Sequence, residues 1–370
     1  MMAGLVAAVL AAGVRNGTAD EVVTTAALSE SRAVLSGLRT RSIKNAERHL
    51  GLIGGRLERT RGPRLDGRNL NASTLAVRFS GDSPEKSATF ETRRLLAPEK
   101  ERRTRRTAVW FGGNVTLDSA RAEKPRFATV YTDGLAFGVD TRFGRRLLVG
   151  NAVGMAFDRT GIGDGGTLAT RYLSNTLYGS LTTATDTYLD VAVGASRGTF
   201  RRHDGTGFFD AGGSPATQVF GLARHSRTFR RDKLRFRSYG QAKYLQTYFG
   251  SCRTPSGAYF ASSTAQSLEL TLGLRGETSR RTNLGKVSPH AVLEISRTMK
   301  SRSGTTLTFA ESIEDLAAAS TSRSGKLSAR TGLNWALSDS TTINGEYAVS
   351  SALGEFNARQ KVTASFKLKF

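Results

Sequence analysis

The sequence is poor in cysteine, proline and long apolar runs, and each shortage excludes a class of protein. Cys252 is the one cysteine among 370 residues, which excludes an internal disulfide and a cysteine-based zinc site. The longest apolar run, Met1 to Val14, is too short to cross a bilayer as a helix, and it lacks the basic residues that normally precede the apolar part of a signal peptide. Seven prolines against 40 glycines, without a collagen-like period, favour a turn-rich β protein.

Negative charge is also scarce. The chain has 31 acidic and 54 basic side chains, a formal net charge of +23, which indicates acidic partners such as nucleic acid or an anionic membrane surface. The excess is spread out: residues 1–106 hold 20 basic and 11 acidic residues, and the remainder holds 34 and 20. This spread argues against a dedicated nucleic-acid tail, and we predict no nucleic-acid partner and contact with anionic lipid instead.

A helical period runs from Asp20 to about Leu57. Apolar residues recur mostly at three- and four-residue steps, at Leu28, Leu35, Leu38, Ala46, Leu50, Ile53 and Leu57. Basic residues lie between them, so the pattern predicts an amphipathic helix whose basic face includes Arg39, Arg41 and Lys44. Either this helix docks on a core with its basic face in water, or it lies in a polar, acid-lined channel.

From Thr107 onward the period is two. In the last segment, Lys361–Phe370, the apolar residues alternate strictly with lysine, threonine and serine, which is typical of a strand with one apolar and one wet face. About twelve such segments follow one another, each near the length that a tilted strand needs to cross a membrane. They start near Thr107, Phe127, Arg146, Leu168, Thr187, Ala216, Leu234, Gln266, Val287, Gly325, Ser340 and Lys361.

The connections between these segments alternate between short and long, and charged residues lie in mid-strand on the wet face. Both features are typical of a transmembrane barrel with tight turns at one end, longer loops at the other, and a polar lumen. The residues predicted to line that lumen are Asp190, Glu269, Arg275, Glu277, Arg330 and Glu346. Period two alone also fits a soluble barrel or sandwich, including a basic one that binds nucleic acid.

Two short motifs match strings known from catalytic or nucleotide-binding sites, but neither is followed by the helix that such sites require. Gly194–Gly198 fits the hydrolase string G-x-S-x-G around Ser196, but it ends a strand and no helix follows. His203 and His225 are its possible partners. Gly161–Gly166 contains G-x-G-x-x-G, again without a following helix, and the four histidines lack metal-ligand spacing. We therefore predict no catalytic, cofactor or metal site, and no enzyme.

Several stretches, in order, resemble the C-terminal β-domain of autotransporters, the type V secretion translocators of Gram-negative bacteria. The matching stretches are Val109–Gly113, Gly138–Phe143, Leu148–Gly154, Leu177–Gly179, Tyr188–Gly194, Leu272–Gly276 and Phe366–Phe370. The resemblance covers about Thr107 to Phe370. It implies a twelve-stranded antiparallel β-barrel in the bacterial outer membrane, in an all-β fold with an α-helical N-terminal segment that enters the pore.

The resemblance also implies partners and a division of the chain. Residues 1–106 are expected to form a helical and linker segment, as a passenger remnant or pore helix, and residues 107–370 the barrel. The barrel-assembly machinery is expected to recognise Phe366, Leu368 and Phe370, and outer-membrane lipid and lipopolysaccharide to surround the barrel. The implied function is anchoring and export of an N-terminal passenger. A stand-alone porin or adhesin barrel and a barrel-wall hydrolase remain alternatives. Charge reversal at Arg39, Arg41 and Lys44 is expected to raise pore conductance.

Overall fold

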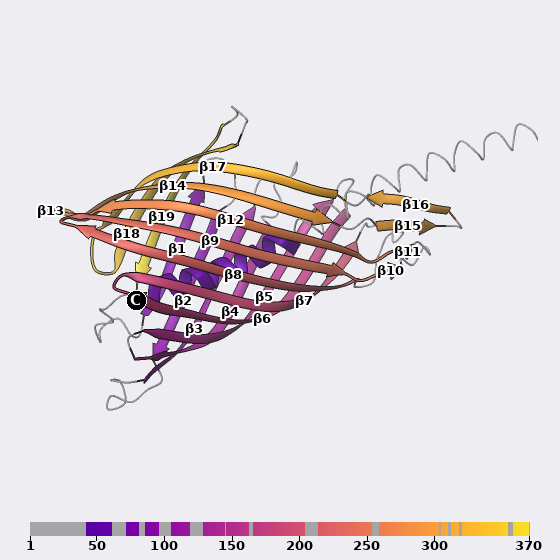
Figure 1. Ribbon diagram of the computed structural model, residues 1–370, viewed down its shortest axis with the longest axis horizontal. Coiled ribbons are helices and arrows are strands. Elements are labelled where there is room, and N and C mark those ends of the chain that lie inside the picture. Colours follow the sequence, from indigo (N-terminus) through magenta and orange to yellow (C-terminus); the bar gives the residue numbers. More distant parts are fainter. Residues whose placement is uncertain are drawn as a thin grey trace, which may run out of the picture.

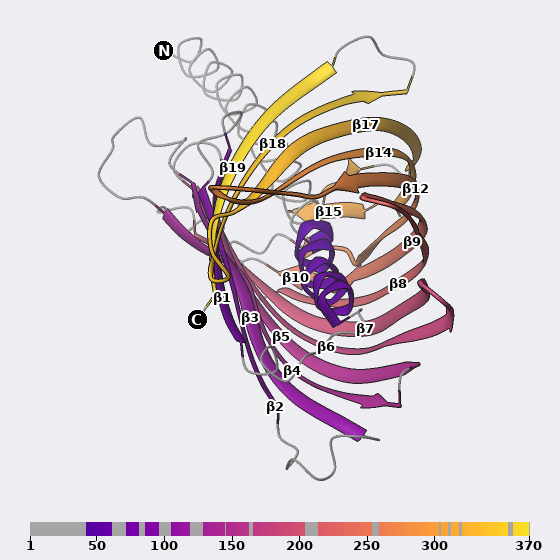
Figure 2. The ribbon, with the colours of Figure 1, turned by 90° about the vertical axis from the view of Figure 1, so that its left-hand side faces the viewer.

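A computed structural model describes residues 42–60, 72–80, 86–95, 105–118, 129–144, 146–162, 166–203, 214–253, 259–302, 305–309, 312–317, 320–353 and 358–369. Its main feature is one large antiparallel sheet that curves around a helix (Figures 1 and 2). The long strands are β1 Ala72–Ser80, β2 Lys86–Leu95, β3 Arg105–Asp118, β4 Thr129–Phe143, β5 Leu147–Ile162, β6 Gly166–Ala184, β7 Thr187–His203, β8 Ser214–Arg231, β9 Leu234–Phe249, β12 Ser263–Thr278, β14 Gly285–Arg302, β17 Ser320–Ala336, β18 Thr341–Ala352 and β19 Ala358–Lys369.

These fourteen strands pair with their neighbours in the sequence, and the first also pairs with the last. β1 pairs with β19, and β12 pairs with both β9 and β14, so each strand has an antiparallel partner on both sides. A further short strand, β13 (Arg280–Thr282), extends the β12–β14 hairpin. All twelve expected strands are present, but the count of twelve is wrong, because the sheet has two more.

The two additional strands are β1 and β2. The sequence predicts linker here, as part of the helical and linker segment of residues 1–106. Both strands belong to the same sheet: Val77 is opposite Phe366, and Arg93 is opposite Trp110. The sheet therefore begins before the expected boundary at residue 107.

Side chains alternate between the two faces of the sheet, as the period-two pattern predicted. On β6, Leu173 and Leu177 point outward and are 55% and 57% exposed, while Tyr172 and Tyr178 point inward and are buried. Large exposed hydrophobic residues continue around the outside on β12, β14 and β17, with Leu272 at 65%. An outer surface of this kind suits contact with lipid chains.

Connections at the two ends of the sheet differ in length. At one end, β6–β7 and β8–β9 are joined by two residues each, with Asp186 and Asp232 in left-handed conformation. At the other end, the connections after β9 and β14 are long, and they pair into a second sheet of β10 (Cys252–Arg253), β11 (Tyr259–Phe260), β15 (Thr305–Phe309) and β16 (Ser312–Ala317). The β5–β6 connection, at this same end, departs from the expected alternation, since only residues 163–165 lie between the two strands.

Residues 42–60 form a helix, called here the internal helix. It lies within the curve of the sheet, toward β7 and β8 (Figure 2). Ala46, Leu50, Ile53 and Leu57, four of the apolar residues that predicted it, are buried against the wall. The expected helix spanned Asp20–Leu57, of which residues 20–41 lie outside the described part of the chain. No helix among the described residues has the length and hydropathy needed to cross a bilayer.

Candidate functional site

The interface between the internal helix and the sheet holds the largest buried cluster in the described residues. The helix contributes Ala46, Leu50, Ile53 and Leu57, of which Ile53 and Leu57 are fully buried. The sheet contributes a row of residues from β3 to β9: Trp110, Ala136, Leu148, Ala152, Tyr178, Ala192, Phe220, Leu222 and Leu245. We call the inner face of β3–β9 the covered wall. Full burial of a leucine or isoleucine stabilises by about 1.5–3 kcal/mol, so these contacts hold the helix firmly.

The first turn of the helix is fixed at the end of the sheet that carries the long loops. Gln218 on β8 donates to the Ser42 carbonyl (2.9 Å) and to Thr247 Oγ1 on β9 (3.1 Å). Ser42 Oγ and Thr247 Oγ1 are also hydrogen-bonded at 2.8 Å. Thr247 lies two residues before the end of β9, where the long connection to β12 begins. Residue 42 therefore lies near the long-loop end.

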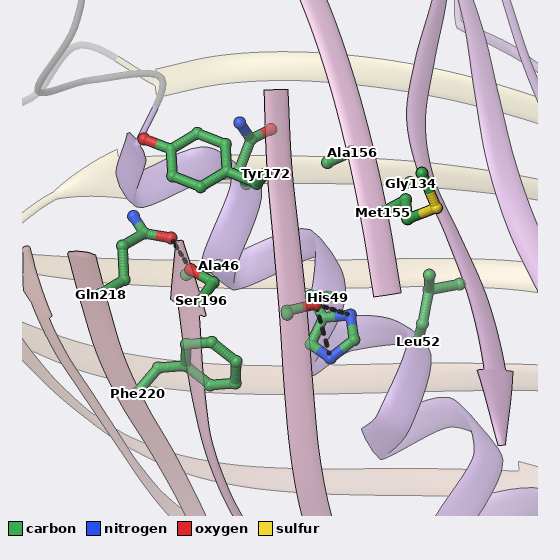
Figure 3. Close-up of a pocket in the computed structure, with 12 residues that line it drawn as sticks. Ala46, His49, Leu52, Gly134, Met155, Ala156, Tyr172, Ser196, Gln218 and Phe220 are labelled. Atoms are coloured by element: carbon green, nitrogen blue, oxygen red, sulfur yellow. Dashed lines mark hydrogen bonds between the residues drawn. The ribbon is translucent and has the colours of Figure 1, made fainter. Parts of the chain in front are cut away.

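His49 occupies the middle of the interface. Its Nε2 is hydrogen-bonded to Thr176 Oγ1 on β6 at 2.7 Å. Its ring contacts Phe220 edge-on, and both rings are drawn in Figure 3. Gly154 on β5 makes room for the imidazole, because a Cβ there would lie 2.5 Å from His49 Cε1. The cavity beside this ring is about 20 Å³, room for a water-sized group and not for an organic substrate.

Arg56, near the end of the helix, contacts charged and aromatic groups from three strands, and a residue of a fourth strand binds two of those groups. Its side chain is 1% exposed; Nε donates to Asp140 Oδ2 on β4 at 2.8 Å, and Nη1 donates to Glu91 Oε1 on β2 at 3.0 Å. The guanidinium lies 5.7 Å from the ring centre of Trp110 on β3. Tyr178 on β6 donates to Asp140 and accepts from Trp110. We call these five residues the Arg56 clamp.

A second buried ion pair lies on the opposite side of the same helical turns. Arg224 on β8 donates to Asp190 Oδ2 (3.3 Å), to Glu58 Oε1 (3.0 Å) and to the Gly54 carbonyl (3.3 Å). Asp190 is fully buried and also accepts from Ser180 at 2.7 Å. Because a buried carboxylate needs compensating partners, Asp190 holds Arg224 in place against the helix.

The six residues predicted to line the lumen all lie on the inner face. Asp190 is the one that faces the helix interface. The other five pair along the rest of the wall: Glu269 with Lys243 (2.9 Å), Arg275 with Glu277 (3.3 Å), Arg330 with Glu294 (2.7 Å) and Glu346 with His290 (3.5 Å). In these ion pairs, all five residues have partners on the sheet and none on the helix.

Of the three residues predicted to form the basic face of the helix, the structure describes one. Lys44 is exposed, and Arg39 and Arg41 lie outside the described residues. The helix residue that binds Asp140 and Glu91 of the sheet is Arg56. The helical pattern contained Arg56 among its basic residues but did not distinguish it from the others. Its partners were visible too, since Trp110, Asp140 and Tyr178 all fall in the stretches that carry the family resemblance. Period two could not say that these three side chains meet.

The hydrolase alternative lacks its geometry. Ser196 is buried within β7 and donates to Gln218 Oε1 at 2.7 Å. His225 lies on the outer face of β8, opposite Leu189 and seven residues from Ser196 in the ladder, so it does not pair with Ser196. Of His203 only the backbone is described. Within the described residues, no three histidine, cysteine or acidic side chains are grouped so that they could hold a metal ion.

Comparison with known proteins identifies the family of the chain. A family model described as autotransporter beta-domain matches residues 110–348. Among solved structures, the β-domain of the Bordetella autotransporter BrkA aligns with 15% identity and a TM-score of 0.40, covering 81% of this chain and 98% of that one. The translocator domain of NalP from Neisseria meningitidis aligns with 11% identity and a TM-score of 0.39, covering 87% and 95%. No curated protein matches the chain.

Proposed function

Because the chain belongs to the autotransporter β-domain family, we propose that its barrel anchors an N-terminal passenger segment and helps to export it to the cell surface. The protein is a β-barrel of the bacterial outer membrane. In such barrels the short turns face the periplasm and the longer loops face the exterior. The two ends of the sheet can therefore be oriented.

The direction of the internal helix is the observation that carries the proposal. Ser42 is bound near the ends of β8 and β9 that lead to the long loops. At the other end, Arg142, two residues from the short β4–β5 turn, donates to the Thr60 carbonyl. The described helix therefore runs from the exterior end of the barrel at Ser42 to the periplasmic end at Thr60, so a segment attached ahead of Ser42 would join it at the exterior end.

The Arg56 clamp gives this arrangement its anchoring role. Breaking a buried ion pair by removing one partner costs about 3–5 kcal/mol, so the clamp and the buried apolar face resist withdrawal of the helix. A segment attached ahead of the helix would stay tied to the membrane through these contacts. The proposal needs no chemical step, and we assign no catalytic residue.

Further partners follow from the same proposal. The outward residues of β19, Phe366 and Leu368, together with the terminal Phe370, which lies outside the described residues, would be recognised by the barrel-assembly machinery. The exposed apolar residues of the outer face would contact lipid, and the basic β8–β9 turn region would lie near anionic headgroups, as expected for arginines at a membrane surface.

Accessibility of epitope tags on intact cells tests the export proposal. A tag inserted ahead of Ser42 should be removed by external protease. A tag in the long β9–β12 connection is the positive control for surface exposure, and a tag at Asp339, in the short β17–β18 turn, should be cleaved only after the outer membrane is permeabilised. If the tag ahead of Ser42 is protected while the loop tag is cleaved, the export proposal fails and the porin or adhesin alternative is favoured.

A further inference from the structure

The inner face beyond the helix is a separate surface with its own character. We call the inner face of β12, β14, β17, β18 and β19 the water-facing wall. On β17 its residues Ser324, Lys326, Ser328, Arg330, Gly332 and Asn334 are half-buried or exposed. The side chains of Arg275 and Arg330 are 37% and 35% exposed although both point inward. Water therefore reaches this wall alongside the internal helix.

Cross-strand register lines up positive charge on this wall. Residues that are directly opposite one another on adjacent strands form a continuous row across the inner face. One such row, starting on β9 and ending on β19, is Arg237, Arg275, Val292, Arg330, Ala348 and Lys361. Four of its six members are cationic and none is acidic. We call it the cationic row.

The rows on either side do not cancel this charge. Toward the short turns the members are Arg235, Glu277, His290, Gly332, Glu346 and Thr363, and toward the long loops they are Tyr239, Gly273, Glu294, Ser328, Ser350 and Arg359. The three rows together hold six arginines and lysines against three glutamates. Glu58 of the helix adds one more acidic group through its contact with Arg237 at 3.4 Å. A positive excess remains.

Ion pairs hold the cations of the row in place, but the arginine side chains remain accessible to water. Arg330 contacts Glu294 at 2.7 Å, and Tyr239 donates to the other oxygen of that glutamate. Arg275 contacts Glu277 at 3.3 Å. Because the arginines stay partly exposed, their field acts on ions in the adjacent water.

We propose that the lumen beside the internal helix is an anion-selective path, with the cationic row as its selectivity element and small inorganic anions such as chloride as the ions it passes. Rings of arginine and lysine favour anions in other pores, because they lower the energy of a negative ion at a constriction and raise that of a cation. Clefts lined by one sign of charge between low-dielectric walls strengthen this effect. The inference is independent of passenger export, since all members of the cationic row except Arg237 lie on the wall that the helix does not cover.

Reversal potentials of the purified full chain in planar bilayers test the inference. Under a KCl gradient, the wild type should show a permeability ratio of chloride to potassium above one. The triple variant Arg275→Gln, Arg330→Gln, Lys361→Gln should shift the reversal potential toward zero or to the potassium side. A matched double variant, Arg227→Gln, Arg297→Gln, removes exposed arginines from the outer face of β8 and β14 and should keep the wild-type value.

Folding of each variant is checked by the heat-dependent mobility shift of folded barrels on gels, and export by cleavage of the tag ahead of Ser42. A folded wild type that does not conduct, that prefers potassium or that shows no preference overturns the inference. So does a folded triple variant with unchanged selectivity. Normal tag cleavage alongside these results would leave the export proposal standing, whereas loss of cleavage with intact selectivity would count against export alone.

Discussion

The covered wall and the water-facing wall belong to one sheet with the same alternation, yet their inner faces are built differently. On β6, all inward residues from Thr170 to Ser180 are buried, and large aromatic residues meet glycines across the strands. On β17, the inward residues from Ser324 to Asn334 are small or charged, and none of them is buried. Alternation thus separates inward from outward side chains on both walls. The inward side chains are packed where the internal helix lies against them and solvated where it does not.

The largest expected effect that separates the two walls is at the Arg56 clamp. Arg56→Ala should lower the free energy of unfolding by about 3–5 kcal/mol, because Asp140 is left buried without its cation. Arg59→Ala is the control, since Arg59 contacts the same Glu91 but is 49% exposed, and it should cost less than about 1 kcal/mol. Urea unfolding of the barrel in lipid vesicles, followed by gel mobility, measures both. Equal losses would mean that the clamp does not hold the helix.

The next effect concerns steric fit. Gly154→Ala places a methyl group against His49 and Ser174, and overpacking of this kind should cost about 1–3 kcal/mol. Gly345→Ala on β18 is the matched substitution, because no atom lies within 4 Å of its added Cβ. The same urea series compares them. A tolerated alanine at residue 154 would show that the helix moves freely against the covered wall.

A third comparison uses one ion pair from each wall. The Asp190–Arg224 pair is 0% and 12% exposed, and the Glu294–Arg330 pair is 23% and 35% exposed. Double-mutant cycles would combine Asp190→Asn with Arg224→Gln, and Glu294→Gln with Arg330→Gln. The expected coupling free energy is about 1.5–3 kcal/mol for the first pair and about 0.2–1 kcal/mol for the second. High salt should weaken only the second coupling. Similar values would erase the energetic distinction between the walls.

The smallest expected effect is on the exposed face of the helix. Gly51→Ala meets no atom within 4 Å of its new Cβ, so the gain in helix propensity should appear without a steric cost and stabilise by about 0.5–1 kcal/mol. Gly51→Pro removes a backbone donor and should destabilise instead. Thermal mobility shifts measure both changes. A destabilising alanine would show that this face of the helix is not free of contacts.

The sequence predicted the alternating strands and the buried helix face because both depend on local periodicity. It missed β2 because the strand has few apolar outward residues: Phe90 packs on Phe111, whereas Thr92 on the same face is polar. It also missed the Arg56 clamp, since Arg56, Glu91 and Asp140 are 35 to 84 residues apart and only the strand order brings them together. The periodicity of apolar residues therefore predicts helices and strands, but not the side-chain contacts between them.

Among the described residues, the strands whose side chains bind the internal helix run from β2, with Glu91, to β9, with Thr247. In the described part of the chain, the last five strands of the ladder contribute no residue to the buried cluster around the helix. The contacts that hold the helix and the β1–β19 junction thus depend on different strands, so a substitution at that junction leaves the residues of the buried cluster unchanged.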